Sequence, residues 1–118
     1  MERHDQQLEE AWKTILERAR TVEKFTSGLS LVQFKANTRA NYATVYCLEL
    51  VADASLELSS QSRSRHPDVP WYDFVEEAEF YRRHYDRVSL DNVWGTVHEK
   101  LPILVAAAEA ELGRAPDR

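Results

Sequence analysis

The fold class is decided by residues 42–56, YATVYCLELVADASL, where apolar side chains fall on nearly every side of a helix. We predict this helix over about 39–59. A helix that is apolar almost all round belongs in the middle of a bundle, because every side needs a neighbour that excludes water. Two acids, Glu49 and Asp53, interrupt it one turn apart on one face. Their carboxylates must face a cavity, a partner or solvent, since burying them unpaired is costly.

Helical signals also precede the central segment. Residues 5–26 carry apolar side chains at spacings of three and four, and Gly28 can supply a left-handed cap to the end of that helix. Ser30 and Gln33 form a capping box that starts a short helical turn over 31–36. We therefore expect one long and one short helix before the central one.

Two further helices are predicted after the central segment. Pro70 suits the first position of a helix over about 70–86. The last helix spans about 91–112, and Pro102 should kink or loosen it. The polar residues 59–69 show no periodicity and predict a plain connection. The whole pattern indicates an all-α, up-and-down helical bundle of four to five helices.

Length and composition fit a single domain over residues 1–118. The chain is 43% hydrophobic and 30% charged, which is typical of a folded globular domain. It has no apolar leader and no stretch long enough to span a membrane. The lone Cys47 lies on an apolar stripe and is interpreted as a core residue rather than a nucleophile. We expect a cytoplasmic protein that does not associate with membranes.

The net charge of −5 argues against a protein that coats nucleic acid through bulk charge, although two basic clusters stand out. Arg63, Arg65 and His66 form the first, which we interpret as a solvated surface. The four histidines are scattered without zinc spacing, so no metal site is predicted, and no phosphate-binding glycine loop or other cofactor motif occurs.

The second basic cluster, within residues 81–87, has more chemical promise. In a metal-free ribonuclease, an imidazole such as that of His84 takes the proton of the 2′-hydroxyl group. A neighbouring guanidinium stabilises the charge that builds on the phosphoryl oxygens. The alternative interpretation is that Arg82 and Arg83 pair with Glu79 along one helix face and do no chemistry.

Five stretches occur in a specific order and spacing: FTSGLS (25–30) followed by Phe34, ADA (52–54), HPDVPW (66–71), YDRVSLDNVW (85–94) and LP (101–102). Together they resemble the HepT-like branch of the HEPN superfamily of ribonuclease toxins, over nearly the whole chain. The ADA stretch stands where family members often carry Gly-Glu-Ala.

The resemblance implies a bundle of the HEPN, nucleotidyltransferase-substrate-binding type. It also implies a homodimer that cleaves RNA, without a metal ion, in the cleft between protomers. Family members resemble toxins of a toxin–antitoxin pair. Their antitoxin is a nucleotidyltransferase that silences the toxin by attaching AMP to a tyrosine.

The family's catalytic signature is Arg, four residues, His, one residue, Tyr, and this chain breaks it. Placing Trp71 and Trp94 on the family's two tryptophans without a gap assigns the arginine position to Ala78. The histidine position falls on Arg83, and the tyrosine position falls on Tyr85. Arg83 cannot act as a general base, because a guanidinium keeps its proton at any working pH. Only the tyrosine, a candidate for modification, is retained.

A shifted site of Arg82, His84 and Tyr85 is the remaining catalytic alternative. On a helix, however, one residue turns a side chain by about 100°, so His84 would face away from where Arg83 points. Tyr85 could instead serve only in packing. The catalytic candidates are therefore Arg82, Arg83 and His84.

Three functions follow from these patterns. The first is a toxin-type ribonuclease acting through an altered or impaired site. The second is a catalytically silent dimeric partner of a nucleotidyltransferase, with Glu49 and Asp53 near the rim of a nucleotide or partner groove. The third is a helical scaffold without a ligand, which would leave the family spacing unexplained.

Overall fold

The computed structural model describes residues 2–113, so the predicted tail over 114–118 lies outside the described residues. Every regular element in the described range is helical, which confirms the all-α class. The elements are α1 (Glu2–Thr26), α2 (Leu31–Ala36), α3 (Thr38–Leu56), α4 (Ser60–Ser64), α5 (Trp71–Arg83), the 3-10 turn η1 (Tyr85–Arg87), α6 (Leu90–Gly95), the π-helical turn η2 (Thr96–Lys100) and α7 (Leu101–Gly113). None of these helices is long and apolar enough to cross a membrane.

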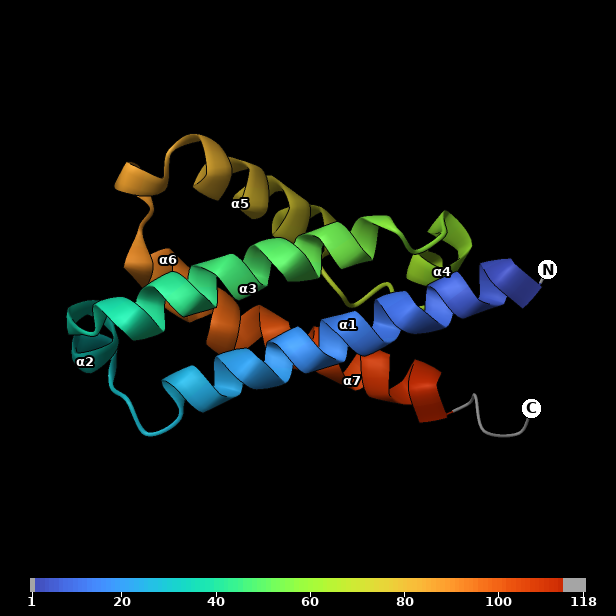
Figure 1. Ribbon diagram of the computed structural model, residues 1–118, viewed down its shortest axis with the longest axis horizontal. Coiled ribbons are helices and arrows are strands. Elements are labelled where there is room, and N and C mark those ends of the chain that lie inside the picture. Colours follow the sequence, from blue (N-terminus) through green and yellow to red (C-terminus); the bar gives the residue numbers. More distant parts are fainter. Residues whose placement is uncertain (1, 114–118) are drawn as a thin grey trace.

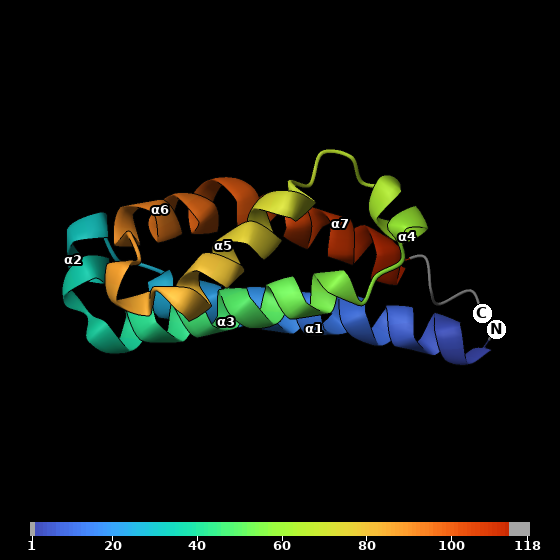
Figure 2. The same cartoon turned by 90° about the horizontal axis from the view of Figure 1, so that it is seen from above.

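The long helices form the predicted up-and-down bundle. Helices α1 and α3 lie side by side and run in opposite directions, and α7 lies along α1 (Figure 1). Helix α5 crosses obliquely over α3, as Figure 2 shows, while α6, η2 and α7 follow one another as a single interrupted rod. The start of α1 and the end of α7 lie at the same end of the bundle.

One hydrophobic cluster runs through the bundle and receives side chains from each of the longer helices. Its largest fully buried members are Ile15, Val22, Phe34, Val51, Val93, Leu101 and Leu104. Full burial of one such side chain stabilises the fold by about 1.5–3 kcal/mol. Cys47 belongs to this cluster, which confirms its interpretation as a core residue.

The prediction that the central helix is enclosed on all sides is wrong for one face of α3. Tyr42 and Tyr46 are 67% and 61% exposed, and Leu56 near the helix end is also exposed. Helices α1, α2 and α5 cover the other sides of α3. The exposed face also carries Glu49 and Asp53, because spacings of three and four place these residues on one line.

The predicted caps at Gly28 and Ser30 agree with the structure. Gly28 has a φ of 80°, a left-handed conformation that costs a glycine little. The capping box of Ser30 and Gln33 is complete, with hydrogen bonds of 3.1 and 2.9 Å. The side chain of Asn37 caps α3 by accepting a hydrogen bond from the Ala40 backbone N–H.

Residues 59–69 are not the plain connection that was predicted. Ser59 caps the short helix α4, and Arg63 donates hydrogen bonds to the carbonyl oxygens of Ser55 and Leu58, at 3.0 and 2.8 Å. These bonds add a side-chain cap to the carbonyl groups at the end of α3. The segment therefore closes α3 and sets the chain direction into α5.

The first basic cluster is a structural clamp rather than the solvated surface that was expected. Arg65 donates two hydrogen bonds to Glu111, at 3.2 and 3.0 Å, and His66 Nε2 lies 2.6 Å from the same carboxylate. The ring of His66 also meets the edge of Trp12. The cluster thus ties the segment before α5 to α1 and α7.

Pro102 loosens the last helix, as predicted. It has no N–H group to donate to the preceding turn. The turn before it is π-helical, and the Leu101 N–H donates to the carbonyl of Thr96, five residues back. π-helical turns of this kind are rare and occur often at functional sites.

Candidate functional site

Helix α5 carries Arg82 and Arg83 and ends earlier than the sequence predicts. Its buried stripe of Phe74, Ala78 and Tyr81 stops at Tyr81, and the helix itself ends at Arg83 rather than at residue 86. Most of the stability of a short helix comes from packing of its apolar face, so the chain leaves the helix where that packing stops. His84 and Tyr85 therefore lie beyond the helix, and the helical rotation assumed for them does not apply.

Arg82 is held by the two acids of α3. Its Nη2 donates to both carboxylate oxygens of Asp53, at 2.9 and 2.8 Å, and its Nε donates to Glu49 at 3.1 Å. These hydrogen bonds, the Asp53 bond most of all, raise the pKa of the guanidinium. The predicted pairing of Arg82 with Glu79 is wrong. Glu49 and Asp53 instead face Arg82. Their carboxylates accept from the N–H groups with which Arg82 would otherwise bind a phosphate.

Arg83 and His84 point to different partners. Arg83 is exposed and lies 3.4 Å from Glu79, which confirms that predicted pair. The His84 ring lies beside Phe80, with ring centroids 5.1 Å apart, and its Nδ1 is 3.4 Å from Arg87 Nη2. Among the described residues of this chain, no hydrogen bond joins His84 to Arg82 or to Tyr85.

Tyr85 is 75% exposed on η1, so it does not pack within the bundle of this chain. It borders a groove of about 450 Å³ between α3 and the chain that leads into α6. We call this the tyrosine groove; it is lined by Asn41, Tyr42, Val45, Tyr46, Glu49, Tyr85, Val88 and Leu90. Of the two acids expected near a groove rim, Glu49 is among the lining residues and Asp53 is not.

Ala78, at the arginine position of the signature, is 3% exposed on the side of α5 that packs inward. An alanine there offers no positive charge to a phosphate. The remaining candidates occupy separate places: Arg82 with the α3 acids, Arg83 with Glu79, and His84 beside Phe80. One chain alone therefore does not bring Arg82, Arg83 and His84 to a common point; the guanidinium that lies beside the His84 imidazole is that of Arg87.

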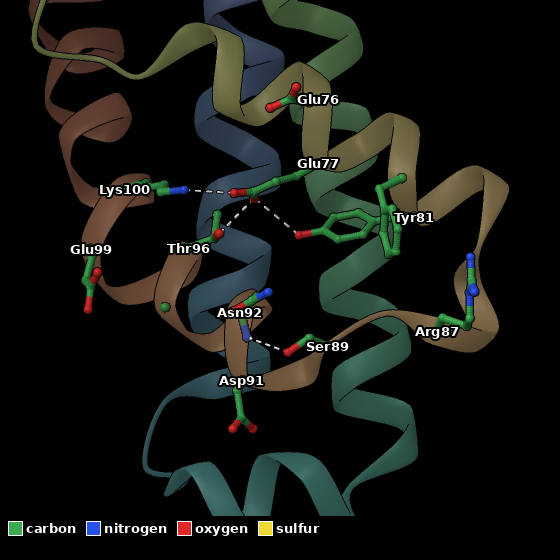
Figure 3. Close-up of a pocket in the computed structure, with 12 residues that line it drawn as sticks. Glu76, Glu77, Tyr81, Arg87, Ser89, Asp91, Asn92, Thr96, Glu99 and Lys100 are labelled. Carbon is green, nitrogen blue, oxygen red and sulfur yellow. Dashed lines mark hydrogen bonds and ion pairs between the residues drawn. The ribbon is translucent and has the colours of Figure 1, made fainter.

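Sequence reasoning missed a polar network in a larger cavity between α5 and the α6–η2 segment (Figure 3). This cavity measures about 870 Å³, and Glu77 stands in its wall. The Glu77 carboxylate accepts hydrogen bonds from Thr96 and Lys100, both at 2.8 Å, and a longer one from Tyr81 at 3.4 Å. Lys100 also pairs with Asp73 at 3.3 Å.

This network fixes the π-helical turn to α5. Burial raises the pKa of Tyr81, and the nearby Glu77 carboxylate raises it further. The only signal in the sequence was the spacing of four residues between Glu77 and Tyr81. The pairing with Thr96 and Lys100 joins positions 19 and 23 residues apart, which no local pattern reveals.

Among the residues that the structure describes, no three His, Cys, Asp or Glu side chains converge as metal ligands. The carboxylates near the candidate residues are instead paired with cations, Glu49 and Asp53 with Arg82 and Glu77 with Lys100.

Comparison with known proteins bears on the meaning of this site. The family model described as "Ribonuclease HepT-like" matches residues 15–111. A "Probable ribonuclease HepT" of Thermococcus cleftensis is 26% identical over 90 residues, which cover 76% of this chain and 82% of the relative. A "Putative RNase" of Methanocaldococcus jannaschii is 30% identical over 88 residues, which cover 75% and 81%. Comparison with solved structures gave no match. The chain therefore belongs to the HepT-like ribonuclease family.

Proposed function

We propose that this chain is the toxin-family member of a toxin–antitoxin pair, acts in the cytoplasm, and has an impaired ribonuclease site. The family chemistry would be metal-independent RNA cleavage. A base takes the proton of the 2′-hydroxyl, and a guanidinium stabilises the phosphoryl oxygens. Here Ala78 stands at the arginine position and Arg83 at the histidine position.

The engagement of Arg82 is the observation that carries this proposal. Arg82 is the arginine nearest to the lost position, one turn beyond Ala78, and it would have to replace the missing guanidinium. Its Nε and Nη2 donors are bound to Glu49 and Asp53 instead. To bind a phosphate it would have to leave two carboxylates, which would then stay near the phosphate and repel it. A shifted site of Arg82, His84 and Tyr85 is therefore not favoured.

Growth of cells on induction tests the toxin assignment and its impairment together. We expect the unaltered chain to slow growth only weakly, and Arg83→His to slow growth more because it returns an imidazole to the signature. His84→Ala serves as the matched control, with growth equal to that of the unaltered chain. Strong growth arrest by the unaltered chain that His84→Ala relieves would overturn the proposal in favour of a working shifted site.

A catalytically silent partner of a nucleotidyltransferase is the second candidate function. It is favoured by Tyr85, which keeps the signature position, is 75% exposed, and has a hydroxyl with no hydrogen bond to a described residue. An accessible, unengaged hydroxyl suits an acceptor of an AMP group. Incubation with the neighbouring nucleotidyltransferase and ATP should add the mass of one AMP group. Tyr85→Phe should prevent the addition, and Tyr72→Phe, which also alters an exposed tyrosine, should not.

Pairing with a second copy belongs to the same proposal. Because one chain does not bring Arg82 and His84 together, a cleft between two copies is where the family's chemistry would have to occur. Light scattering of the purified chain should give the mass of a dimer. A mass equal to that of a monomer at all concentrations tested would refute the proposed pairing with a second copy.

A further inference from the structure

We propose that the larger cavity, together with the face of α5 beside it, is a docking surface for a basic amphipathic helix of a partner protein. This inference goes beyond the proposed function, because it involves neither the signature positions nor Tyr85. Three observations carry it: an exposed line of aromatic residues on α5, the cavity that opens beside this line, and an excess of carboxylates around the cavity.

One face of α5 is exposed although it carries two aromatic residues. Tyr72 and Phe80 are 72% and 43% exposed. Glu76 lies between them, four residues from each, so the three side chains follow one line along the helix. The buried side chains of α5 lie at other positions, among them Phe74 and Tyr81. A partner helix that lays its apolar side into a groove recognises such a line of apolar side chains at helical spacing.

The larger cavity gives the side chains of a partner room beside this line. Glu76 and Phe80 line it from α5, and Thr96 and Glu99 line it from η2 on the other side (Figure 3). Hydrogen bonds from Thr96 and Lys100 to Glu77 tie the two walls together, so the cavity is already formed before a partner binds. A lysine or arginine side chain can lay its methylene groups along Phe80 while its charged end reaches the carboxylates.

The charge around the cavity selects a basic partner. Six carboxylates stand there, four in the lining and two directly beside it: Glu76, Glu77, Asp91 and Glu99, with Asp73 bound to Lys100 and Asp86 next to Arg87 in the chain. Against them stand three cations, Arg87, Lys100 and Lys35, of which Lys35 is bound to Asp91.

The resulting excess of three negative charges is more than half of the net charge of the chain, −5. Glu76 and Glu99 are exposed and have no ion pair with a described residue, so both carboxylates are open to a partner. A surface of this sign repels the phosphates of a nucleic acid and attracts lysine and arginine side chains.

The extent of the surface favours a helix over a small cation. Tyr72 lies outside the cavity, about 12 Å along α5 from Phe80 at the rise of an α-helix. A polyamine that filled the cavity would leave Tyr72 exposed, whereas a helix along α5 would cover Tyr72, Glu76 and Phe80 together. Among the described residues no three His, Cys, Asp or Glu side chains converge on a metal ion, so a metal ion is not the favoured occupant either.

Fluorescence anisotropy of the full chain with a labelled peptide tests the proposal. The probe is a helical peptide of about fourteen residues, with leucines along one face and lysines beside them. A scrambled peptide of the same composition and an analogue with glutamate in place of lysine serve as controls. We expect the probe to bind at least about fivefold more tightly than either control. Glu76→Lys and Phe80→Ala should each weaken binding by about fivefold or more, because a few central residues carry most of the energy of an interface.

Two control variants make the same chemical changes elsewhere on the surface. Glu23→Lys reverses an exposed acid of α1, and Tyr42→Ala removes an exposed aromatic residue of α3; neither position lines the cavity. Both variants should bind the probe as the unaltered chain does, and circular dichroism would show that all variants are folded. Equal weakening by either control variant, or equal binding of the scrambled peptide, would overturn the proposal in favour of general attraction to an acidic protein.

Tyr72→Ala separates a helix from a small cation as the occupant. It should weaken binding of the peptide probe and leave binding of spermidine, measured by calorimetry, unchanged. Unchanged peptide binding by Tyr72→Ala would overturn the helix as the occupant and leave the cavity as a site for a small cation.

Discussion

Arg82 on α5 and Asp53 on α3 are joined by two hydrogen bonds from one guanidinium nitrogen to both carboxylate oxygens, at 2.9 and 2.8 Å. Glu49, one turn earlier on α3, accepts from the same guanidinium at 3.1 Å. The contact links the central helix to the helix that carries the broken signature. It also neutralises the charge of Arg82, the arginine that could most easily replace the one missing at position 78. The site thus combines a missing arginine with an arginine that is already occupied.

The first prediction concerns the strength of this contact. Arg82 and Asp53 side chains are 39% and 48% exposed, so solvent screens their attraction. We expect Asp53→Asn to lower the free energy of unfolding by about 0.2–1 kcal/mol. A double-mutant cycle with Arg82→Gln should give a coupling energy of the same size.

Urea denaturation followed by tryptophan fluorescence measures this effect. Asp68→Asn is the control, because Asp68 is an exposed acid with no ion pair to a described residue. A coupling energy indistinguishable from zero would show that Arg82 is free in solution and available to a phosphate.

The second prediction concerns Glu77, the centre of the network in the larger cavity. Glu77→Ala leaves the buried hydroxyl of Thr96 without its partner. An unsatisfied buried polar group costs about 1–3 kcal/mol, and we expect a loss of stability in that range. Glu76→Ala removes an exposed neighbouring acid and should change stability by no more than about 0.5 kcal/mol. Equal effects of the two substitutions in urea denaturation would contradict the role assigned to the network.

The third prediction follows from the raised pKa of Tyr81. In the unfolded chain this phenol loses its proton near pH 10, whereas burial and Glu77 keep it protonated in the folded protein. Above pH 10 the unfolded state therefore binds fewer protons than the folded state, and stability falls as pH rises. Tyr81→Phe should flatten this alkaline decline between pH 9 and about 11. An unchanged slope in the variant would mean that another group causes the decline.

The fourth prediction concerns the acid limb of stability. Burial alone would raise the pKa of Glu111, but hydrogen bonds from Arg65 and His66 outweigh it and lower the pKa. A lowered carboxyl pKa stabilises the fold above the unfolded value of about 4.5, and this stability is lost as pH falls below it. Glu111→Gln should remove that part of the decline and cost about 2 kcal/mol at pH 7.

Glu109→Gln is the matched control, because Glu109 is also on α7 and paired with an arginine, Arg20, but lies at the exposed surface. Thermal unfolding from pH 3 to pH 7 compares the two variants. Parallel pH profiles of the two variants would show that the contacts of Glu111 with Arg65 and His66 stabilise the fold no more than a surface ion pair does.

Much of the fold could be predicted from local patterns. The capping box at Ser30, the left-handed Gly28 and the loosening before Pro102 each depend on neighbours within a few residues. The apolar run of α3 correctly predicted a bundle, but it could not show which face stays uncovered. Tyr42 and Tyr46 look like core residues in sequence, because exposure depends on which helices pack around them.

The candidate site was less predictable, because its contacts join distant parts of the chain. Arg82 was expected to pair with Glu79 along one helix, but its partner Asp53 lies 29 residues away on α3. The end of α5 at Arg83 depends on where its packing against α3 stops, which the pattern of aromatic residues through Tyr85 concealed. The family resemblance located the signature positions, whereas only the structure showed what holds the arginine beside them.

Single-turnover cleavage of labelled tRNA tests the central claim most directly, with the unaltered chain, His84→Ala and Arg83→His compared at equal excess over RNA. Arg83 is exposed, so its replacement should leave the fold intact, and circular dichroism would check this. The account predicts no cleavage by the unaltered chain beyond that of His84→Ala, and measurable cleavage by Arg83→His. Cleavage by the unaltered chain that falls on His84→Ala would contradict the account, because it would show that His84 works with Arg82 in a shifted but active site.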